Sequence, residues 1–181
     1  AVIQFSLDGR IEHANSNFLD LMGYQLHEVQ GKHHSIFVEP GTANSAAYQQ
    51  FWADLREGKS QTAEFKRIAK SGREVWIRAS YTPIVKNGKV HKVIKFASDV
   101  TEQVAKQANF ESQLQAIHRA QAVIEFDLDG KILFANPNFL SLMGYSLKEV
   151  TGQHHRIFVD PQEAASSRYS DFWRRLKEGQ Y

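Results

Sequence analysis

The sequence has no cysteine. Without a thiol, the chain cannot contain a disulfide framework, an iron–sulfur cluster, a thiolate haem ligand or a flavin attached through a cysteine sulfur. Long apolar runs are lacking too, because the longest, such as residues 93–97, are far shorter than the roughly 20 residues of a membrane-spanning helix. No signal peptide precedes Ala1, so we expect a cytoplasmic protein that does not cross a membrane.

Charge of one sign is not concentrated anywhere in the sequence. The net charge is +2, and the lysines and arginines are scattered among acidic residues, so no nucleic-acid partner is predicted. The sequence has no glycine-rich phosphate loop, no HExxH and no GxSxG, so an enzyme is not predicted either. Apolar residues make up 42% of the chain and aromatic residues 12%, which is typical of a globular protein.

A long internal repeat dominates the sequence. Residues 1–58 align with residues 122–179 without a gap, and roughly 35 of about 60 paired positions are identical, which indicates a duplicated domain. We expect a complete copy over residues 1–103, a helical connector over 104–121 and the N-terminal part of a second copy over 122–181. An incomplete sheet leaves an edge and an apolar face uncovered. The second copy is therefore expected to borrow strands from another chain or to belong to a longer protein.

Within the first copy, the periodicity changes from strands to helices and back to strands. Alternating residues on both sides of an Asp8-Gly9 turn predict a strand pair, and helical spacing follows, with Asn15, like its counterpart Asn136, as a favoured N-cap. Three alternating segments joined by x-Gly turns then predict further strands at residues 63–70, 74–85 and 90–100. This order predicts an α+β fold, with short helices on one face of a five-stranded antiparallel sheet.

A connector helix is predicted after the last of these strands. Asp99, with Glu102 three residues later, resembles a capping box that starts this helix. Phe110, Leu114 and Ile117 fall near one face of it. This stripe suffices for a contact between two helices but is shorter than a coiled coil requires.

Several segments together resemble the PAS domain family. They are LDGRIEHANSNFLDLMGY, EVQGKHHSIF, FWADLREGKSQTAEFKRIAKSGREVWIRASYTPI and KFASDVTEQ. The chain is similar to the tandem PAS sensory domains of cytoplasmic methyl-accepting chemoreceptor-like proteins, of the aerotaxis transducer and biofilm-dispersion regulator type. The resemblance implies a PAS fold and a sensing function, with FAD in the cleft of some similar proteins and haem in others. Asp99 and Thr101 match the signal-transmitting end of PAS domains.

The resemblance also implies candidate cofactor-binding residues. Trp52 and Trp173 match a tryptophan of flavin-binding aerotaxis PAS domains, where an indole face stacks on a flavin or adenine ring; a place in the core is the alternative. His34 and its counterpart His155 match a histidine of the same domains. The basic and aspartic residues that follow it in those domains are replaced here by Val38, Glu39 and Gly41.

Arg67 and Trp76 on the expected sheet strands are further cofactor-binding candidates. Trp76 shares a strand face with Arg78 by the period of two. If that face lines the cleft, an arginine there meets a dinucleotide phosphate; a solvated or dimer-facing arginine is the alternative.

The adjacent histidines His33 and His34, repeated at 154–155, allow a second interpretation, in which one of them ligates haem. Adjacent residues point in different directions, so at most one faces a common site. No Asp, Glu or Cys recurs at ligand spacing, so a metal-ion site is not predicted. A helix cap or another hydrogen-bonding role is the favoured interpretation.

Three functional hypotheses follow. The first is a redox or oxygen sensor whose cofactor alters the sheet, with the change passing through Asp99 and Thr101 into the connector. The second is a cofactor-free dimerisation and relay module whose cleft is filled by its own aromatic residues. The third places the PAS pair before a histidine kinase or a diguanylate cyclase. The first is preferred, in a homodimer that is strand-swapped, domain-swapped or neither, with a chemotaxis kinase or adaptor as partner through a signalling domain outside this chain.

Overall fold

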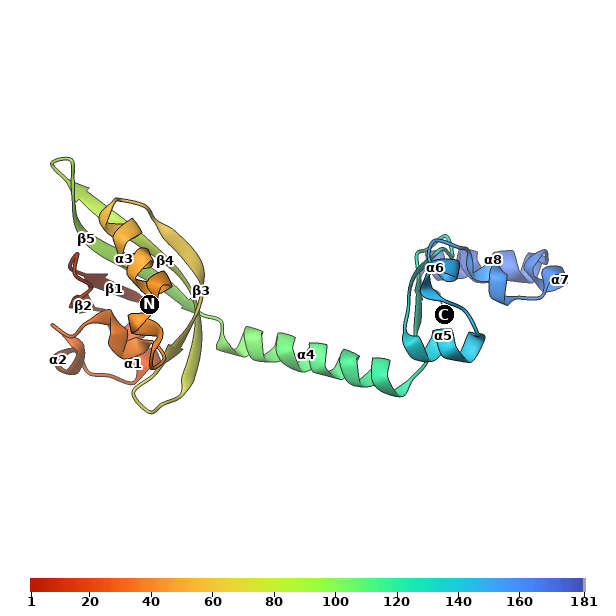
Figure 1. The fold of residues 1–181 in the computed structure, drawn as a ribbon, viewed down its shortest axis with the longest axis horizontal. Helices are drawn as coiled ribbons and strands as arrows, with labels where there is room; N and C mark the ends of the chain where they lie inside the picture. The colour runs from red at the N-terminus through yellow and green to blue at the C-terminus, as the bar shows by residue number, and fades with distance from the viewer. Residues whose placement is uncertain (181) are drawn as a thin grey trace. The chain divides into compact units, whose positions relative to one another are not determined.

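The computed structural model describes residues 1–180 of the chain (Figure 1). The chain divides into two compact units, Ala1–Gln107 and residues 108 onward. The first unit contains the complete copy of the repeat, and the second contains the partial copy. Among residues 1–180, no helix combines the length and the apolar character that crossing a membrane requires.

One antiparallel sheet of five strands forms the frame of the first unit. Its strands are β1 (Val2–Phe5), β2 (Ile11–Ala14), β3 (Gln61–Ile68), β4 (Glu74–Lys86) and β5 (Lys89–Asp99). They lie in the order β2-β1-β5-β4-β3, so β5 is the central strand and pairs with both β1 and β4. The predicted α+β fold with a five-stranded antiparallel sheet is confirmed.

The hairpin between β4 and β5 turns at Asn87-Gly88, one of the expected turn signals. Both residues have positive φ, 52° for Asn87 and 74° for Gly88. Positive φ at both central positions is the type I′ geometry, whose twist matches that of the flanking strands and for which Asn-Gly is strongly favoured. The turn fixes the pairing of β4 with β5 and hence which residues face the interior.

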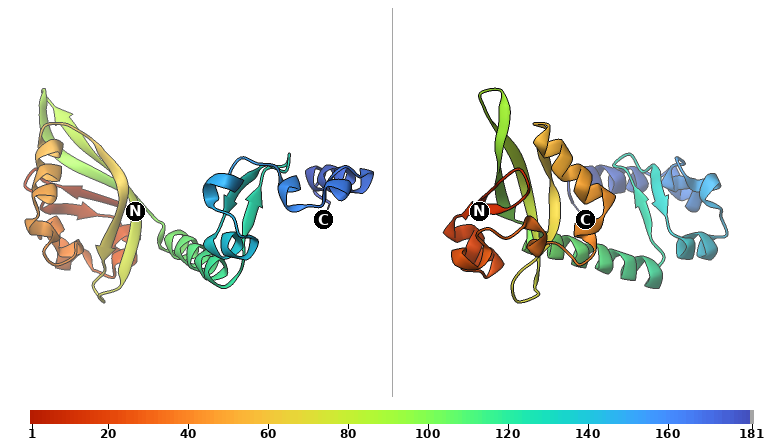
Figure 2. Two further views of the ribbon diagram at one scale, coloured as in Figure 1. Left: turned by 45° about the vertical axis from the view of Figure 1, so that its right-hand side comes forward. Right: turned by 60° about the vertical axis from the view of Figure 1, so that its left-hand side comes forward.

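Short helices connect β2 to β3 and cover one face of the sheet (Figures 1 and 2). They are α1 (Ser16–Met22), α2 (Leu26–Val29), η1 (His34–Phe37), η2 (Thr42–Asn44) and α3 (Ala46–Arg56), where η denotes a 3-10 helix. Asn15 caps α1 by accepting a hydrogen bond from the Phe18 N–H. The capping role predicted for Asn15 is therefore confirmed.

The core lies between these helices and the inner face of the sheet. Along β4, buried residues alternate with more exposed ones, so that one face packs inward: Val75, Ile77, Ala79 and Tyr81. Helix α3 buries Trp52 and Leu55, and α1 buries Phe18 and Met22. Full burial of such side chains contributes about 1.5–3 kcal/mol each, and this packing fixes the polar groups among them.

The connector helix α4 (Thr101–Ala120) follows β5 and has no buried residue. The second unit contains a two-stranded hairpin and short helices: β6 (Ile124–Phe126), β7 (Ile132–Ala135), α5 (Pro137–Met143), α6 (Leu147–Val150), η3 (His155–Phe158), α7 (Pro161–Ala164) and α8 (Ser167–Lys177). Its smaller core is centred on Ile132, Ala135 and Val150. The repeated sequence thus forms the same strand pair and main helices in both units.

A candidate ligand site in the interior of the first unit

Aromatic rings surround His34 in the interior of the first unit. Its ring centroid lies 5.3 Å from that of Phe5, 5.6 Å from that of Trp52 and 5.8 Å from that of Tyr81, each edge to face. The Tyr48 ring stacks on His34 at 5.8 Å. Aromatic pairs in such arrangements add about 0.5–1.5 kcal/mol beyond burial. The helices and the sheet together therefore hold this cluster in place.

Both ring nitrogens of His34 have hydrogen-bond partners. Nδ1 lies 2.8 Å from the Tyr48 hydroxyl, and Nε2 lies 3.0 Å from the Tyr81 hydroxyl. Nη2 of Arg67 donates to the same Tyr81 hydroxyl at 3.1 Å. Burial lowers the pKa of His34 well below its usual value, and the charges of Arg67 and Lys95 act in the same direction. The imidazole is therefore neutral near pH 7.

Lys95 occupies the centre of the sheet. It lies on the central strand, opposite Ile3 of β1 and Tyr81 of β4, and it is fully buried. Its Nζ atom lies 5.0 Å from the Tyr81 ring centroid and 5.4 Å from that of Phe18. Burial lowers the pKa of Lys95 well below its usual value, and the charge of Arg67 adds to this effect.

Four buried side-chain donor atoms lack a hydrogen-bond acceptor within residues 1–180. Three of them are in the first unit, Nζ of Lys95, Nε of Arg67 and Nε1 of Trp52, and the fourth is Nε1 of Trp173 in the second unit. Burial raises the pKa of the nearby Tyr48 hydroxyl, and the Trp52 indole N–H, as a weak donor to it, opposes this effect; the contact falls outside hydrogen-bond geometry, so Nε1 of Trp52 has no well-formed partner. An unsatisfied buried donor costs about 1–3 kcal/mol, and more if it is charged. A ligand that supplies acceptor atoms would satisfy these donors.

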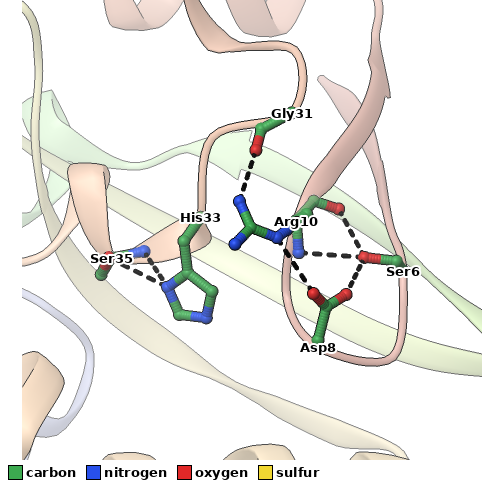
Figure 3. Close-up of polar contacts among 6 residues, drawn as sticks. All are labelled: Ser6, Asp8, Arg10, Gly31, His33 and Ser35. Carbon is green, nitrogen blue, oxygen red and sulfur yellow. Dashed lines mark hydrogen bonds and ion pairs between the residues drawn. The ribbon is translucent and has the colours of Figure 1, made fainter.

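His33 has a structural role beside the N-terminal hairpin (Figure 3). Its Nδ1 accepts a hydrogen bond of 3.1 Å from the Ser35 N–H and so caps η1. A Cβ on Gly9 would lie 2.6 Å from Nε2 of His33, so the turn requires glycine there. Arg10 of the same turn donates to the Gly31 carbonyl at 3.0 Å. The favoured interpretation of His33 as a helix cap is confirmed.

Asp99 and Thr101 join the sheet to α4. The Asp99 carboxylate accepts a hydrogen bond of 2.9 Å from the Thr101 N–H, and the Trp76 N–H on β4 donates to Thr101 Oγ1 at 3.0 Å. The Trp76 carbonyl accepts from the Val100 N–H at 2.9 Å. Since α4 begins at Thr101, the Asp99 carboxylate bonds the first helical residue and not the third, which corrects the expected capping box.

The side chain of Trp76 lies outside the interior. The buried residues of β4 around it are Val75 and Ile77, so Trp76 and Arg78 share the opposite face of the strand. Trp76 therefore does not face the interior with His34 and Arg67, contrary to the placement expected for a cofactor-binding residue there. Arg78 does not face the interior either, and its Nη2 pairs with Glu64 at 2.8 Å. Trp76 acts instead through its backbone, at the junction with α4.

Family models for the PAS fold match both units, one over residues 11–97 and the other over residues 118–180. The chain belongs to the PAS family. Over its whole length it is 42% identical to the biofilm dispersion protein BdlA of Pseudomonas aeruginosa, of which it covers 44%. It is also 31% identical to the aerotaxis receptor of Escherichia coli, over 54% of this chain and 19% of that receptor. The chain thus spans less than half the length of these relatives.

Solved structures share the fold of the PAS domain. A PAS domain from Colwellia psychrerythraea is 23% identical, with a TM-score of 0.50, over 56% of this chain and 86% of that one. A light-oxygen-voltage domain studied with a flavin analogue is 23% identical, with a TM-score of 0.50, over 63% of this chain and 87% of that one. At these identities the likeness establishes the fold alone.

The second PAS domain repeats the ring cluster but not the sheet residues. The His155 ring lies 5.2 Å from Phe126 and 5.7 Å from Trp173, and its Nδ1 lies 3.0 Å from the Tyr169 hydroxyl. Trp173 and His155 thus occupy the places that Trp52 and His34 have in the first domain. The sequence contains no second version of strands β3, β4 and β5.

The unpaired donors of the first PAS domain fit the acceptor atoms of a flavin, and neither ring nitrogen of His34 is free to ligate haem. Flavin carbonyls, ring nitrogens and phosphates are acceptors, which is what the unpaired donors of Trp52, Arg67 and Lys95 require. Haem ligation needs an imidazole nitrogen directed at the iron. Both nitrogens of His34 are bonded to tyrosines, and Nδ1 of His33 caps η1.

Sequence reasoning found part of this site. It predicted Trp52, His34 and Arg67, which the structure brings into one cluster with the Tyr81 hydroxyl. It missed Lys95. The alternation along β5 carries the signal, because Lys95 has an apolar residue two positions before and after it on the buried face. A lysine at such a position is rare unless it serves a site.

Proposed function

We propose that this chain is the sensing part of a chemotaxis or biofilm-dispersion transducer, and that it responds to redox state or oxygen through FAD in the first PAS domain. The observation that carries the proposal is the set of unpaired buried donors on Trp52, Arg67 and Lys95. The biofilm dispersion and aerotaxis relatives support the same function, and the fold occurs in a domain studied with a flavin analogue. The proposal places the chain in the cytoplasm and gives it no catalytic step.

A bound flavin would supply reversible electron uptake. The residues of the chain determine where it lies and which of its states is favoured. Trp52 presents an aromatic face and an N–H, and Arg67 and Lys95 supply charge and donors from the sheet. Positive charge from Arg67 on β3 and Lys95 on β5 would favour the electron-rich state of a flavin, so its two states would differ in how strongly they interact with these residues.

The proposed signal path runs along β4 into α4. Tyr81 of β4 bonds His34 and Arg67 in the interior, and Trp76 of the same strand bonds Thr101 at the start of α4. A ligand changes an output only if it favours one arrangement of these contacts over another. Thr101 is the point at which a displacement of β4 reaches the helix.

The visible spectrum of the purified chain, before and after incubation with FAD, tests the proposal. Flavin absorption bands that remain after free FAD is removed are expected for the wild type, with their loss in Arg67→Met. A chain that retains no flavin contradicts the proposal.

Hydrogen exchange at the start of α4 tests the relay. Chemical reduction of the flavin-loaded chain should change exchange over residues 99–104, and Thr101→Val should weaken that response while flavin remains bound. Thr62→Val is the matched control, because the Thr62 hydroxyl bonds Ser80 on the sheet at 2.7 Å, away from the junction. An equal response in Thr101→Val and the wild type contradicts this path.

The proposal includes a homodimer and, through a signalling domain outside this chain, a chemotaxis kinase or adaptor. The observation behind the homodimer is the exposed stripe of Phe110, Leu114 and Ile117 on α4, whose spacing places them on one helix face. Light scattering should give a dimer for the wild type and a monomer for Leu114→Glu. Ser112→Glu, on another face of the helix, should remain dimeric. A monomeric wild type contradicts this part of the proposal.

A further inference from the structure

The interior of the first PAS domain carries two basic side chains with no buried acid to balance them. Lys95 and Arg67 are both buried, and no aspartate or glutamate in residues 1–180 is. Neighbouring cations on β3 and β4 pair with acids at the surface, as Lys66 does with Glu74. Burying an unpaired charge costs several kcal/mol. Packing alone therefore does not explain this pair.

The two basic side chains lie beside Tyr81 and come from different strands. Arg67 enters from β3 and donates through Nη2 to the Tyr81 hydroxyl, while its Nε has no acceptor within residues 1–180. Lys95 enters from β5, with Nζ 5.0 Å from the Tyr81 ring. The unpaired arginine N–H is only a donor, and so is a lysine ammonium. The arrangement accepts an electron-rich group and repels a cation.

We propose that Lys95 and Arg67 together bind an anionic oxygen-bearing group, and that the Lys95 amine takes up a proton from solvent as this group enters. No covalent bond forms to the ligand. The lone pair of Nζ accepts the proton, and the resulting ammonium pairs with the anion. Without the anion, burial and the charge of Arg67 both oppose a charged Lys95; with it, the ammonium is the favoured form.

The inference rests on the proposed function in that it uses the same interior site. Two sources supply the required chemistry: a flavin, through its phosphates or its reduced anionic ring, and a free organic acid, through its carboxylate. Both offer acceptor oxygens with negative charge. Occupancy of the sensor is then coupled to proton uptake in either case.

The other charged and titratable groups that face Lys95 are Arg67 of β3, Tyr81 of β4 and His34 of η1. Burial raises the pKa of Tyr81 above its usual value and lowers that of His34. Both are therefore uncharged near neutral pH, and an arginine stays charged throughout. Proton uptake that is lost in Lys95→Met therefore reports on Lys95.

Titration calorimetry of the full chain near neutral pH tests the inference. FAD, citrate, succinate and acetate are titrated separately, each in buffers of different ionisation enthalpy, so that the heat reveals the protons taken up. We expect uptake of about one proton per bound ligand. Lys95→Met should lose this uptake and bind roughly tenfold or more weakly. Lys89→Met, exposed on the same strand, is the matched control and should behave as the wild type.

Nuclear magnetic resonance of lysine-labelled wild type gives a second readout that needs no variant. The pKa of Lys95 should rise when the ligand that binds by calorimetry is added. An unchanged value in the saturated complex overturns the inference, whatever the behaviour of Lys95→Met.

The outcomes separate this inference from the proposed function. Binding of a carboxylate that depends on Lys95, without binding of FAD, supports the inference and overturns the flavin function. Binding of FAD with no proton uptake and equal affinity in Lys95→Met supports the flavin function and overturns the inference. Failure of every probe to bind overturns both.

Discussion

The two PAS domains share their ring cluster but differ in the groups around it. His34 and Tyr48 stack at 5.8 Å in the first domain, and His155 and Tyr169 stack at 5.9 Å in the second, both at 15° between planes. The second ring nitrogen of His34 is bonded to Tyr81 of the sheet. The N-terminal half of the domain therefore builds the rings by itself, and the sheet adds the charges and the burial.

The two domains also use an equivalent asparagine differently. Asn15 and Asn136 each accept a hydrogen bond that caps the following helix. Asn136 in addition donates to the carbonyls of Gln121 and His118, at 2.7 and 2.8 Å. His118 is in the last turn of α4, whose carbonyls have no partner within the helix, and Gln121 directly follows the helix. In the second domain, Asn136 therefore caps α5 and also binds the end of α4.

The largest difference in stability between the domains should appear when the equivalent methionines Met22 and Met143 are truncated. Met22 is 0% exposed and Met143 is 37% exposed, because the sheet covers only the former. We expect Met22→Ala to cost about 2–5 kcal/mol of unfolding free energy, and Met143→Ala less than about 1 kcal/mol. Hydrogen exchange of peptides from each domain measures both values. Equal losses would contradict the role assigned to the sheet.

Stability should respond to pH above neutrality in the first domain and not in the second. The pKa of Lys95 is lowered in the folded state, so between this value and its usual one the unfolded chain binds more protons. Stability then rises with pH, by up to about 1.4 kcal/mol per pH unit. The raised pKa of Tyr81 reverses the trend above about pH 10. Urea unfolding at successive pH values measures the profile.

Lys95→Met is the control for this profile. It should remove the rise with pH and, because a buried amine is replaced by an apolar group of similar size, it should be more stable than the wild type near pH 7. The same rise in Lys95→Met would show that another group titrates.

A smaller contrast is expected for the tyrosines that bond the two histidines. Tyr81→Phe removes the partner of His34 Nε2 and of Arg67 Nη2, at a cost of about 1–3 kcal/mol. Tyr169→Phe removes the partner of His155 Nδ1, but His155 is only half-buried and water replaces the bond. We expect a loss below about 1 kcal/mol there. Thermal unfolding, monitored by hydrogen exchange of peptides from each domain, compares the variants. A larger loss of unfolding free energy in Tyr169→Phe than in Tyr81→Phe would contradict this expectation.

The smallest effect should come from the contact that holds the end of α4. Asn138 Nδ2 donates to the Arg119 carbonyl at 2.9 Å, and Asn138 itself is exposed. Asn138→Ala should cost roughly 0.5 kcal/mol and speed hydrogen exchange in the last turn of α4. Asn17→Ala, the equivalent change in the first domain, should leave that exchange unchanged. No change in Asn138→Ala would mean that Asn136 alone holds the helix.

Local signals were sufficient to predict the elements of this fold. Asn15 and Asn87-Gly88 each act through neighbouring backbone groups, so their roles can be predicted from the sequence. The face of a strand is different, because it depends on which elements cover the sheet. Trp76 was therefore assigned to the wrong side. The alternation along β5 places Lys95 on the face of Val93 and Ala97, but its full burial also depends on pairing with β1, which lies far from it in the sequence.

The number of flavins bound by the chain tests directly whether the sheet of the first PAS domain completes the site. Reconstitution with FAD, removal of free flavin and measurement of flavin against protein give this ratio for the wild type, Arg67→Met and Trp173→Phe. We predict one FAD per chain in the wild type and in Trp173→Phe, and none in Arg67→Met. Two FAD per chain, or full retention in Arg67→Met, would show that the shared ring cluster is sufficient and that the sheet residues do not complete the site.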